Sequence, residues 1–219
     1  MAETKEKLQA IFFDFDGVIL DSTRTKTQGF VSLFKDYGSE IIDKVIRHHR
    51  KNGGISRVEK IKYAHETIIG KPLTPAEIDQ WADRYSRLVV KKVTQCPWIK
   101  GAREFLDSCP KDLKIFVISG TPALELTHVI EQREMAHYFH EILGSPTKKP
   151  DHIRRLLKKH GLNPTCCVFV GDALTDFHAA RETRLRFVGI QGEAAFPDGT
   201  RCLTDCRDLR TAVKEHFIL

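Results

Sequence analysis

The chain has no long apolar run, and its basic residues are scattered apart from local clusters at 47–51, 148–149 and 154–159. No stretch approaches the roughly 20 apolar residues that a membrane-spanning helix needs. Residues 1–9 are polar and charged, without the apolar core of a secretory signal. We therefore expect a cytoplasmic protein with no membrane partner. Internal repeats and low-complexity tracts are also missing, which argues against solenoid and fibrous architectures.

The six cysteines lack the spacing of a metal site. Cys166 and Cys167 are adjacent in an apolar stretch, and Cys202 and Cys206 have no matching second pair. This pattern argues against a zinc-finger type of site. We interpret the cysteines as reduced thiols, in keeping with a cytoplasmic location.

The excess of basic residues is mild and scattered. The 219 residues include 35 Lys and Arg against 29 Asp and Glu, a formal net charge of +6. Few aromatic residues alternate with the basic ones, so a nucleic-acid-binding surface is not predicted. Two interpretations of the basic excess remain: a basic face that is simply solvated, or a surface that attracts anionic substrates.

Hydrophobic periodicity divides the chain into two kinds of segment. Residues 21–93 show only helical spacing, and Ser22, Ser56 and Thr74 are the expected N-caps of helices there. Strands and helices alternate from residue 95 onward, and Asp151 is the expected cap of one of the later helices. This alternation predicts an α/β fold with a doubly wound parallel sheet. We expect a Rossmann-like core of residues 1–20 and 95–219, with residues 21–94 inserted as an all-helical cap.

Polar residues that could take part in catalysis or ligand binding lie where the expected strands end. An apolar run ends in Asp14 and Asp16, another ends in Ser119-Gly120-Thr121, and a third ends in Gly171-Asp172. Lys149 precedes Pro150 before the next helix, and Asp176 lies inside the first turn after Asp172. Ligands of such sheets bind at the carboxyl ends of the strands, so these groups are expected to converge.

Together these residues suit phosphoryl transfer. Asp14 is positioned to attack phosphorus, and Asp16 to protonate the leaving oxygen and then activate water. Asp172, with the Asp14 carboxylate and the backbone carbonyl of Asp16, would hold Mg²⁺. Catalysis of this kind depends mainly on positioning and on neutralising phosphate charge.

Two further groups would neutralise or bind the phosphate. The Ser119 hydroxyl and the Gly120 amide can donate hydrogen bonds to phosphate oxygens at a helix N-terminus. Lys149 supplies positive charge. Lys148 competes with Lys149 for this role, and we assign it to Lys149.

Four segments in this order resemble the motifs of the haloacid dehalogenase superfamily. They are Asp14-Phe15-Asp16-Gly17-Val18, Ser119-Gly120-Thr121-Pro122, Lys148-Lys149-Pro150-Asp151 and Gly171-Asp172-Ala173-Leu174-Thr175-Asp176. Within the superfamily the chain looks most like the phosphoglycolate phosphatase and β-phosphoglucomutase branch. The resemblance implies the same roles for Asp14, Asp16, Ser119, Lys149 and Asp172.

The resemblance assigns three more positions. Gly17 and Gly120 fall among the phosphate-binding positions, and Asp176 fits a second-shell position or a water-mediated metal contact. Dehalogenases of the superfamily lack an acid/base aspartate at the position of Asp16. Its presence therefore argues for phosphate esters as substrates.

The expected cap contains one candidate contact to the distal part of a substrate. Gly54-Ile55-Ser56-Arg57 resembles a Gly-x-Ser-Arg segment that some relatives use for this purpose. Arg57 could bind a second anionic group, and a solvated arginine at a helix start is the alternative. We expect His48 and His49 to lie at the surface, and a position in the wall of the cleft is the alternative.

We interpret the chain as a Mg²⁺-dependent phosphatase of a small phosphorylated metabolite, acting through an aspartyl-phosphate intermediate. A phosphomutase of the β-phosphoglucomutase type would share every core residue and is the nearest alternative. A catalytically idle domain that binds phosphorylated ligands is a third interpretation. The sequence does not predict the oligomeric state.

Overall fold

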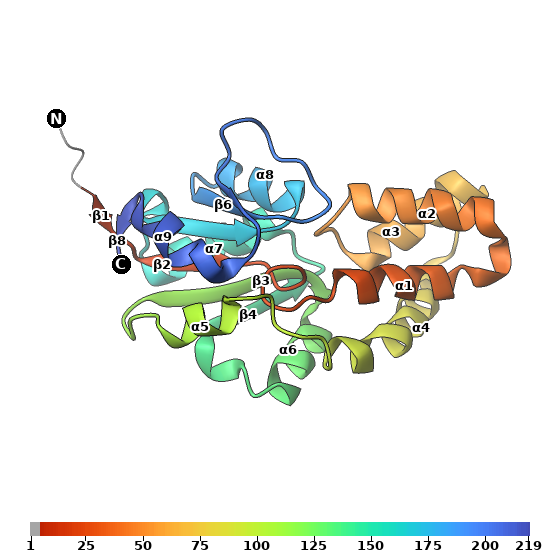
Figure 1. Ribbon diagram of the computed structural model, residues 1–219. Helices are drawn as coiled ribbons and strands as arrows, with labels where there is room; N and C mark the ends of the chain where they lie inside the picture. The colour runs from red at the N-terminus through yellow and green to blue at the C-terminus, as the bar shows by residue number, and fades with distance from the viewer. Residues whose placement is uncertain (1–4) are drawn as a thin grey trace.

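The computed structural model describes residues 5–219 and contains a parallel sheet with flanking helices, beside which lies a group of four helices (Figure 1). The sheet has six parallel strands in the order β4-β3-β2-β5-β6-β7. This arrangement confirms the predicted doubly wound α/β fold. The strands are β2 Ala10–Phe13, β3 Lys114–Pro122, β4 Glu141–Ser145, β5 Cys167–Gly171, β6 Arg186–Ile190 and β7 Cys202–Leu203.

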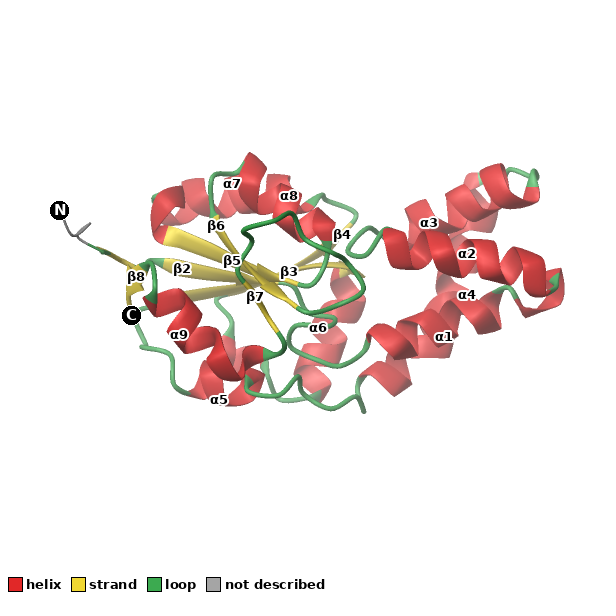
Figure 2. Ribbon diagram, turned by 45° about the horizontal axis from the view of Figure 1, so that its top comes forward, coloured by secondary structure: helices red, strands yellow, loops and turns green. Residues whose placement is uncertain are grey.

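Helices cover both faces of the sheet, which explains why its strands are apolar throughout. Side chains of β2 alternate between two cores: Phe12 packs on one side with Phe116, and Phe13 on the other with Phe105. Helices α7 and α8 cover the first face, and α5, α6 and α9 cover the second (Figure 2). Their bounds are α5 Ala102–Asp107, α6 Ala123–Gln132, α7 Lys149–His160, α8 Leu174–Glu182 and α9 Leu209–Lys214.

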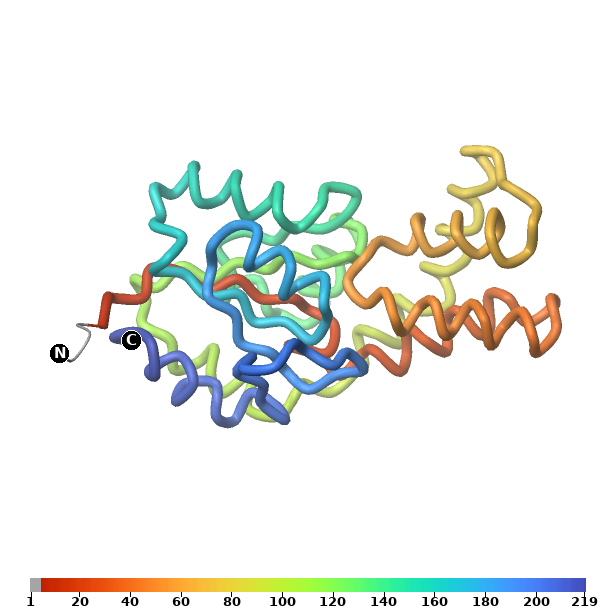
Figure 3. Tube along the Cα trace, turned by 90° about the horizontal axis from the view of Figure 1, so that it is seen from above, coloured from red at the N-terminus to blue at the C-terminus, as the bar shows by residue number. Residues whose placement is uncertain are grey.

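Residues 23–93 form the helical unit beside the sheet (Figure 3). Its helices begin where the sequence predicts. The Ser56 hydroxyl accepts a bond from the Glu59 amide at 3.2 Å, and Thr74 and Glu77 form a capping box. The elements are α1 Thr23–Leu33, α2 Ser39–Lys51, α3 Arg57–Tyr63, the π-helix Ala64–Ile69 and α4 Pro75–Val93.

The helical unit leaves the sheet and returns to it at one place. Leu20 forms an antiparallel bridge with Trp98, and the Asp21 amide donates to the Pro97 carbonyl at 2.9 Å. The helices therefore stand at the carboxyl end of β2. Further along, the Thr175 hydroxyl donates to the Gly53 carbonyl at 2.8 Å, which joins the unit to the first turn of α8.

Some elements differ from the sequence predictions. Helix α7 begins at Lys149, so Asp151 lies inside its first turn and does not cap it. Ser22 precedes α1 but makes no capping bond. The two-residue strands β1 Glu6–Lys7 and β8 Phe217–Ile218 pair with each other and, like β7, are too short to leave a periodic signal.

The remaining short helical turns connect these elements. They are η1 Lys35–Tyr37, η3 Ala136–Tyr138, η4 Pro164–Cys166 and η5 Cys206–Asp208. Across residues 5–219, no helix combines the length and apolar character that crossing a membrane requires.

Candidate active site

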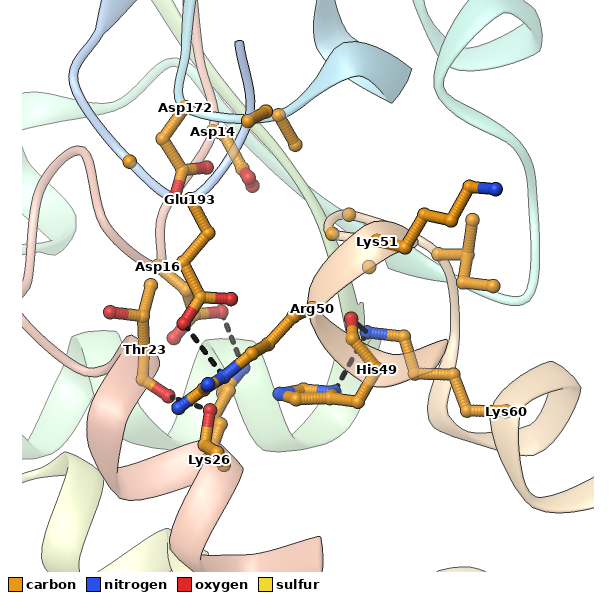
Figure 4. Close-up of a pocket in the computed structure, with 18 of the residues that line it drawn as sticks. Asp14, Asp16, Thr23, Lys26, His49, Arg50, Lys51, Lys60, Asp172 and Glu193 are labelled. Carbon is orange, nitrogen blue, oxygen red and sulfur yellow. Dashed lines mark hydrogen bonds and ion pairs between the residues drawn. The ribbon is translucent and has the colours of Figure 1, made fainter. Parts of the chain in front are cut away.

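A cavity of about 430 Å³ lies between the helical unit and the carboxyl ends of β2, β3 and β5 (Figure 4). The chain runs outward from β2 to β3 and β4 and then crosses back to β5, so the cavity lies where the strand order reverses. Ligands of open α/β sheets bind at such a point. Asp14, Asp16, Ser119, Gly120 and Asp172 all line it, as the sequence predicts.

Asp14 follows β2 and lies at the floor of the cavity. It is 3% exposed, and one carboxylate oxygen accepts the Phe15 amide at 2.7 Å. Burial, with the carboxylates of Asp176 and Asp16 nearby, raises the pKa of Asp14 to about 7, although Lys149 opposes this rise. Its charge therefore depends on a cation being close.

Lys149 provides one such cation. Its ammonium lies 3.1 Å from Asp14 Oδ1 and 2.5 Å from Asp176 Oδ1. Burial disfavours the charged amine, but these two carboxylates outweigh it and raise the pKa of Lys149. Asp176 is fully buried and also accepts the Ala173 amide at 3.1 Å, so it fixes both Lys149 and the start of α8.

The carboxylates of Asp14, Asp172 and Asp176 form a cluster that fits a divalent metal ion. One oxygen from each lies within 4.8 Å of the others. Within residues 5–219 only Lys149 forms an ion pair in this cluster, and the Asp172 carboxylate accepts no hydrogen bond. Burial and the neighbouring Asp14 and Asp176 raise the pKa of Asp172 well above its usual value. Oxygen ligands and excess negative charge are what Mg²⁺ requires.

Gly17 makes room for this cluster. Its φ is +82°, and a Cβ there would lie 2.2 Å from Asp172 Oδ2. Any side chain would therefore be strained and would displace the carboxylate. Glycine is therefore needed at position 17 of the Asp14–Val18 motif, because the Asp172 carboxylate approaches the backbone there.

Asp16 occupies a different environment from Asp14. Its Oδ1 accepts the Ser22 hydroxyl at 2.5 Å, its Oδ2 accepts the Thr121 hydroxyl at 3.0 Å, and Lys26 forms an ion pair with it. Burial alone would raise the pKa of Asp16, but Lys26 and these hydroxyl groups together lower it. These contacts hold the side chain of Asp16 outside the cluster of Asp14, Asp172 and Asp176. The predicted metal contact of Asp16 uses its backbone carbonyl and stays a prediction.

The carboxyl-terminal residues of β3 supply hydroxyl and amide groups opposite Asp16. The Ser119 hydroxyl accepts the Thr121 amide at 3.1 Å and lies 3.4 Å from Asp16 Oδ2. Gly120 lies directly beneath the helical unit: a Cβ there would be 2.4 Å from the Gly54 carbonyl oxygen. The cavity is therefore covered at this edge.

Arg57 lines the cavity, but its charge is already compensated. It forms a two-pronged ion pair with Glu125, at 2.7 and 2.5 Å, and donates to the Ser86 hydroxyl at 2.5 Å. The guanidinium also lies over the Tyr85 ring. Substrate binding by Arg57 stays a prediction, and in this structure the side chain joins α3 to α6.

The cavity also contains residues that the sequence analysis missed. His49, expected at the surface, lies in the wall with its ring 4.6 Å from that of Phe30. The expectation was wrong because adjacent residues on a helix point about 100° apart, so only one of two neighbouring histidines faces outward. The buried Val45, four residues earlier on α2, marks the inward face and would have identified His49. Lys26, Lys60 and Glu193 are among the other charged residues of the lining that the sequence analysis missed.

Comparison with known proteins places the chain in a family. Residues 11–190 match the family model described as haloacid dehalogenase-like hydrolase. The chain belongs to this family. The resemblance inferred from the four motifs is thereby confirmed, and the matched region includes all four motifs and Arg57.

Individual relatives of this haloacid dehalogenase-like chain are distant. It is 24% identical over 196 residues to a phosphoglycolate phosphatase of Psychrobacter arcticus, covering 83% of each chain. It is 23% identical over 219 residues to a phosphorylated carbohydrates phosphatase of Thermotoga maritima, covering 95% and 99%. The crystal structure of a β-phosphoglucomutase from Clostridium difficile shares the fold, with a TM-score of 0.80 at 20% identity and coverage of 95% and 96%.

Proposed function

We propose that this protein is a cytoplasmic, Mg²⁺-dependent phosphatase that hydrolyses a small phosphorylated metabolite through an aspartyl-phosphate intermediate. One observation carries the proposal: two carboxylates from one strand end face the same cavity in opposite environments. Asp14 belongs to the acidic cluster with Lys149, and Asp16 is held by Lys26 and hydroxyl groups. Such a division is typical of a nucleophile paired with an acid/base. Two distant relatives are phosphatases, which supports the substrate class.

In the first step the Asp14 carboxylate attacks phosphorus. A bond forms from its oxygen to phosphorus, and the bond from phosphorus to the ester oxygen breaks. Asp16 delivers a proton to the leaving oxygen. The dianionic phosphate beside Asp16 raises its pKa and so favours the protonated form that this step needs.

In the second step water attacks phosphorus and releases Asp14. Asp16, now ionised, accepts a proton from the attacking water, and the bond between phosphorus and the Asp14 oxygen breaks. The contacts from Lys26, Ser22 and Thr121 stabilise this ionised form. Ser119 and the Gly120 amide lie beside the position where phosphate oxygens would accumulate charge.

The acidic cluster would hold the metal ion through Asp14 and Asp172. When bound, Mg²⁺ offsets the repulsion between the anionic nucleophile and the phosphate. Lys149 supports the same charge balance at Asp14, and Asp176 keeps Lys149 in place.

We further propose that residues 21–94 act as a cap over a core of residues 1–20 and 95–219. Contacts of Gly53 with Thr175, and of Gly54 with Gly120, support a closed cap in this structure. Closure would exclude water from the first step.

The test is phosphate release from an aryl phosphate and from phosphorylated metabolites, with Mg²⁺ and with a chelator. We expect Mg²⁺-dependent release that Asp14→Asn reduces by at least about a thousandfold, as loss of a nucleophile does. A folded protein that releases no phosphate from any substrate would refute the proposal. Conversion of a sugar phosphate to its isomer, without phosphate release, would instead identify a phosphomutase.

A further inference from the structure

Within the part of the chain that the structure describes, Lys60 is a buried basic residue without an acidic partner. It is 6% exposed and lines the cavity from α3. Two neighbouring cations at the cavity are compensated: the half-buried Lys26 pairs with Asp16, and the buried Arg57 pairs with Glu125. Among the described residues 5–219, no carboxylate lies within ion-pair distance of Lys60, and Lys51, which also lacks one, is exposed.

The immediate neighbours of Lys60 do not supply negative charge. Its ammonium lies 3.0 Å from His49 Nδ1 and donates to the His49 carbonyl at 3.3 Å (Figure 4). Burial and Lys60 itself lower the pKa of His49 to about 2, so the ring is neutral at physiological pH. Burial and Lys26 lower the pKa of Lys60 to about 7, opposed only by the more distant charges of Asp16, Asp172 and Glu193.

A buried ammonium without a counterion carries a large desolvation penalty. An anionic ligand entering the cavity would remove much of that penalty and would gain a charge-assisted hydrogen bond. The Lys60 environment is therefore unfavourable for the empty protein and suited to a bound anion.

The line along which Asp14 would attack phosphorus places the leaving group near Lys60. Asp14 attacks from the strand end, and in-line displacement sends the leaving oxygen to the opposite side of phosphorus. In Figure 4 Asp14 and Asp172 lie at one end of the cavity, and His49 and Lys60 lie at the other. The leaving group would extend toward the helical unit and approach Lys60.

We propose that Lys60 binds a second anionic group, a carboxylate or a second phosphate, on the leaving group of the substrate. This inference rests on the proposed phosphatase function and narrows it to phosphate esters with two anionic ends. It transfers the distal contact from Arg57, which Glu125 and Ser86 hold, to a side chain three residues further along α3. A cavity of about 430 Å³ suits a ligand of a few carbon atoms with two such groups.

The experiment compares kcat/KM for three esters: 2-phosphoglycolate, a pentose bisphosphate, and ethyl phosphate, which has no second anion. The variants are Lys60→Met, which keeps the aliphatic stem, and Lys60→Arg, which keeps the charge. Lys62→Met is the matched control, because Lys62 is exposed on the same helix and does not line the cavity.

We expect Lys60→Met to lower the ratio of two kcat/KM values, that for the preferred ester with a second anionic group over that for ethyl phosphate. The expected decrease is about 10- to 100-fold, the effect of losing a hydrogen bond to a charged group. Lys60→Arg should restore most of the ratio, and Lys62→Met should keep it. Of the two esters with a second anionic group, the one with the larger loss identifies that group as carboxylate or phosphate.

An unchanged ratio in a folded Lys60→Met enzyme overturns the inference. An equal loss for all three esters also overturns it, because it would show that Lys60 merely ties α3 to His49 on α2. Wild-type protein inactive on every ester, or activity retained in Asp14→Asn, would instead count against the phosphatase function itself.

Discussion

Arg57 and Glu125 form a buried ion pair that joins α3 of the helical unit to α6 beside the sheet. Both guanidinium nitrogens contact the carboxylate, at 2.7 and 2.5 Å, and the side chains are only 5% and 9% exposed. Removing one partner of a buried pair leaves an uncompensated charge in a medium of low polarity. We therefore expect the position of the helical unit against the sheet to depend on both residues.

We expect Glu125→Gln to lower the free energy of unfolding by about 3 to 5 kcal/mol, because Arg57 would remain buried and charged. Denaturant unfolding followed by circular dichroism measures this change. Glu40→Gln is the matched control, since Glu40 pairs with Lys44 on the exposed face of α2 and should matter little. Similar small changes in both variants would show that the Arg57 pair does not hold the helical unit in place.

Asp14 should make the stability of the metal-free protein depend on pH. Its pKa in the folded state, about 7, lies above its ordinary value of 3.8. Between these values the folded protein binds a proton that the unfolded chain has released. The free energy of unfolding in chelator should therefore fall as pH rises from about 4 to 7, and Asp172 adds to the fall.

Mg²⁺ should reduce or reverse this decline, because a bound cation favours the ionised carboxylates. Urea unfolding at several pH values, with chelator and with Mg²⁺, measures both effects. Asp14→Asn serves as the control and should flatten part of the slope in chelator. A metal-free protein whose stability rises steadily over this pH range would contradict the assigned acidic cluster.

Gly54 should be needed for closure of the helical unit over the cavity. Gly54 and Gly70 have similar backbone angles, with φ of +78° and +74°, so alanine adds about 1 kcal/mol of strain at either position. Only at Gly54 would the new Cβ collide, 2.1 Å from the Thr175 hydroxyl.

We therefore expect Gly54→Ala to lower kcat/KM by up to about 100-fold, as misplacement of groups around a reacting centre does. Gly70→Ala, with no neighbour within 4 Å of the added methyl group, should keep its activity. Steady-state kinetics on an aryl phosphate compares the two. Equal activities would mean that the contact at Thr175 is not required for catalysis.

Lys26 should set the pH at which Asp16 becomes an effective base. Its ion pair lowers the pKa of Asp16, so Lys26→Met should move the acidic limb of the kcat profile upward by about one pH unit or more. Lys62→Met removes the same charge from an exposed position and should leave the limb in place. A lower kcat in Lys26→Met with an unmoved limb would assign Lys26 to packing alone.

Much of this architecture was predictable because its signals are local. The apolar run of β2 before Asp14, the capping box at Thr74 and the helical spacing of residues 21–93 depend on neighbouring residues. The residues after the strands could also be grouped, since parallel strands bring their carboxyl ends to one edge. Where signals were short, prediction failed, as at β7 and at the start of α7.

The sequence by itself determined the α/β fold, the inserted helical segment and the convergence of Asp14, Asp16, Ser119 and Asp172 on one cavity. Only the tertiary structure decided which charges meet: Arg57 with Glu125, Lys26 with Asp16, and Lys60 with no carboxylate in residues 5–219. The physical reason is that hydrophobic periodicity fixes the buried face of an element, whereas an ion pair depends on how two distant elements are oriented. A helix pattern places Lys60 on a face, but the packing of α3 against α2 and the sheet decides what that face meets.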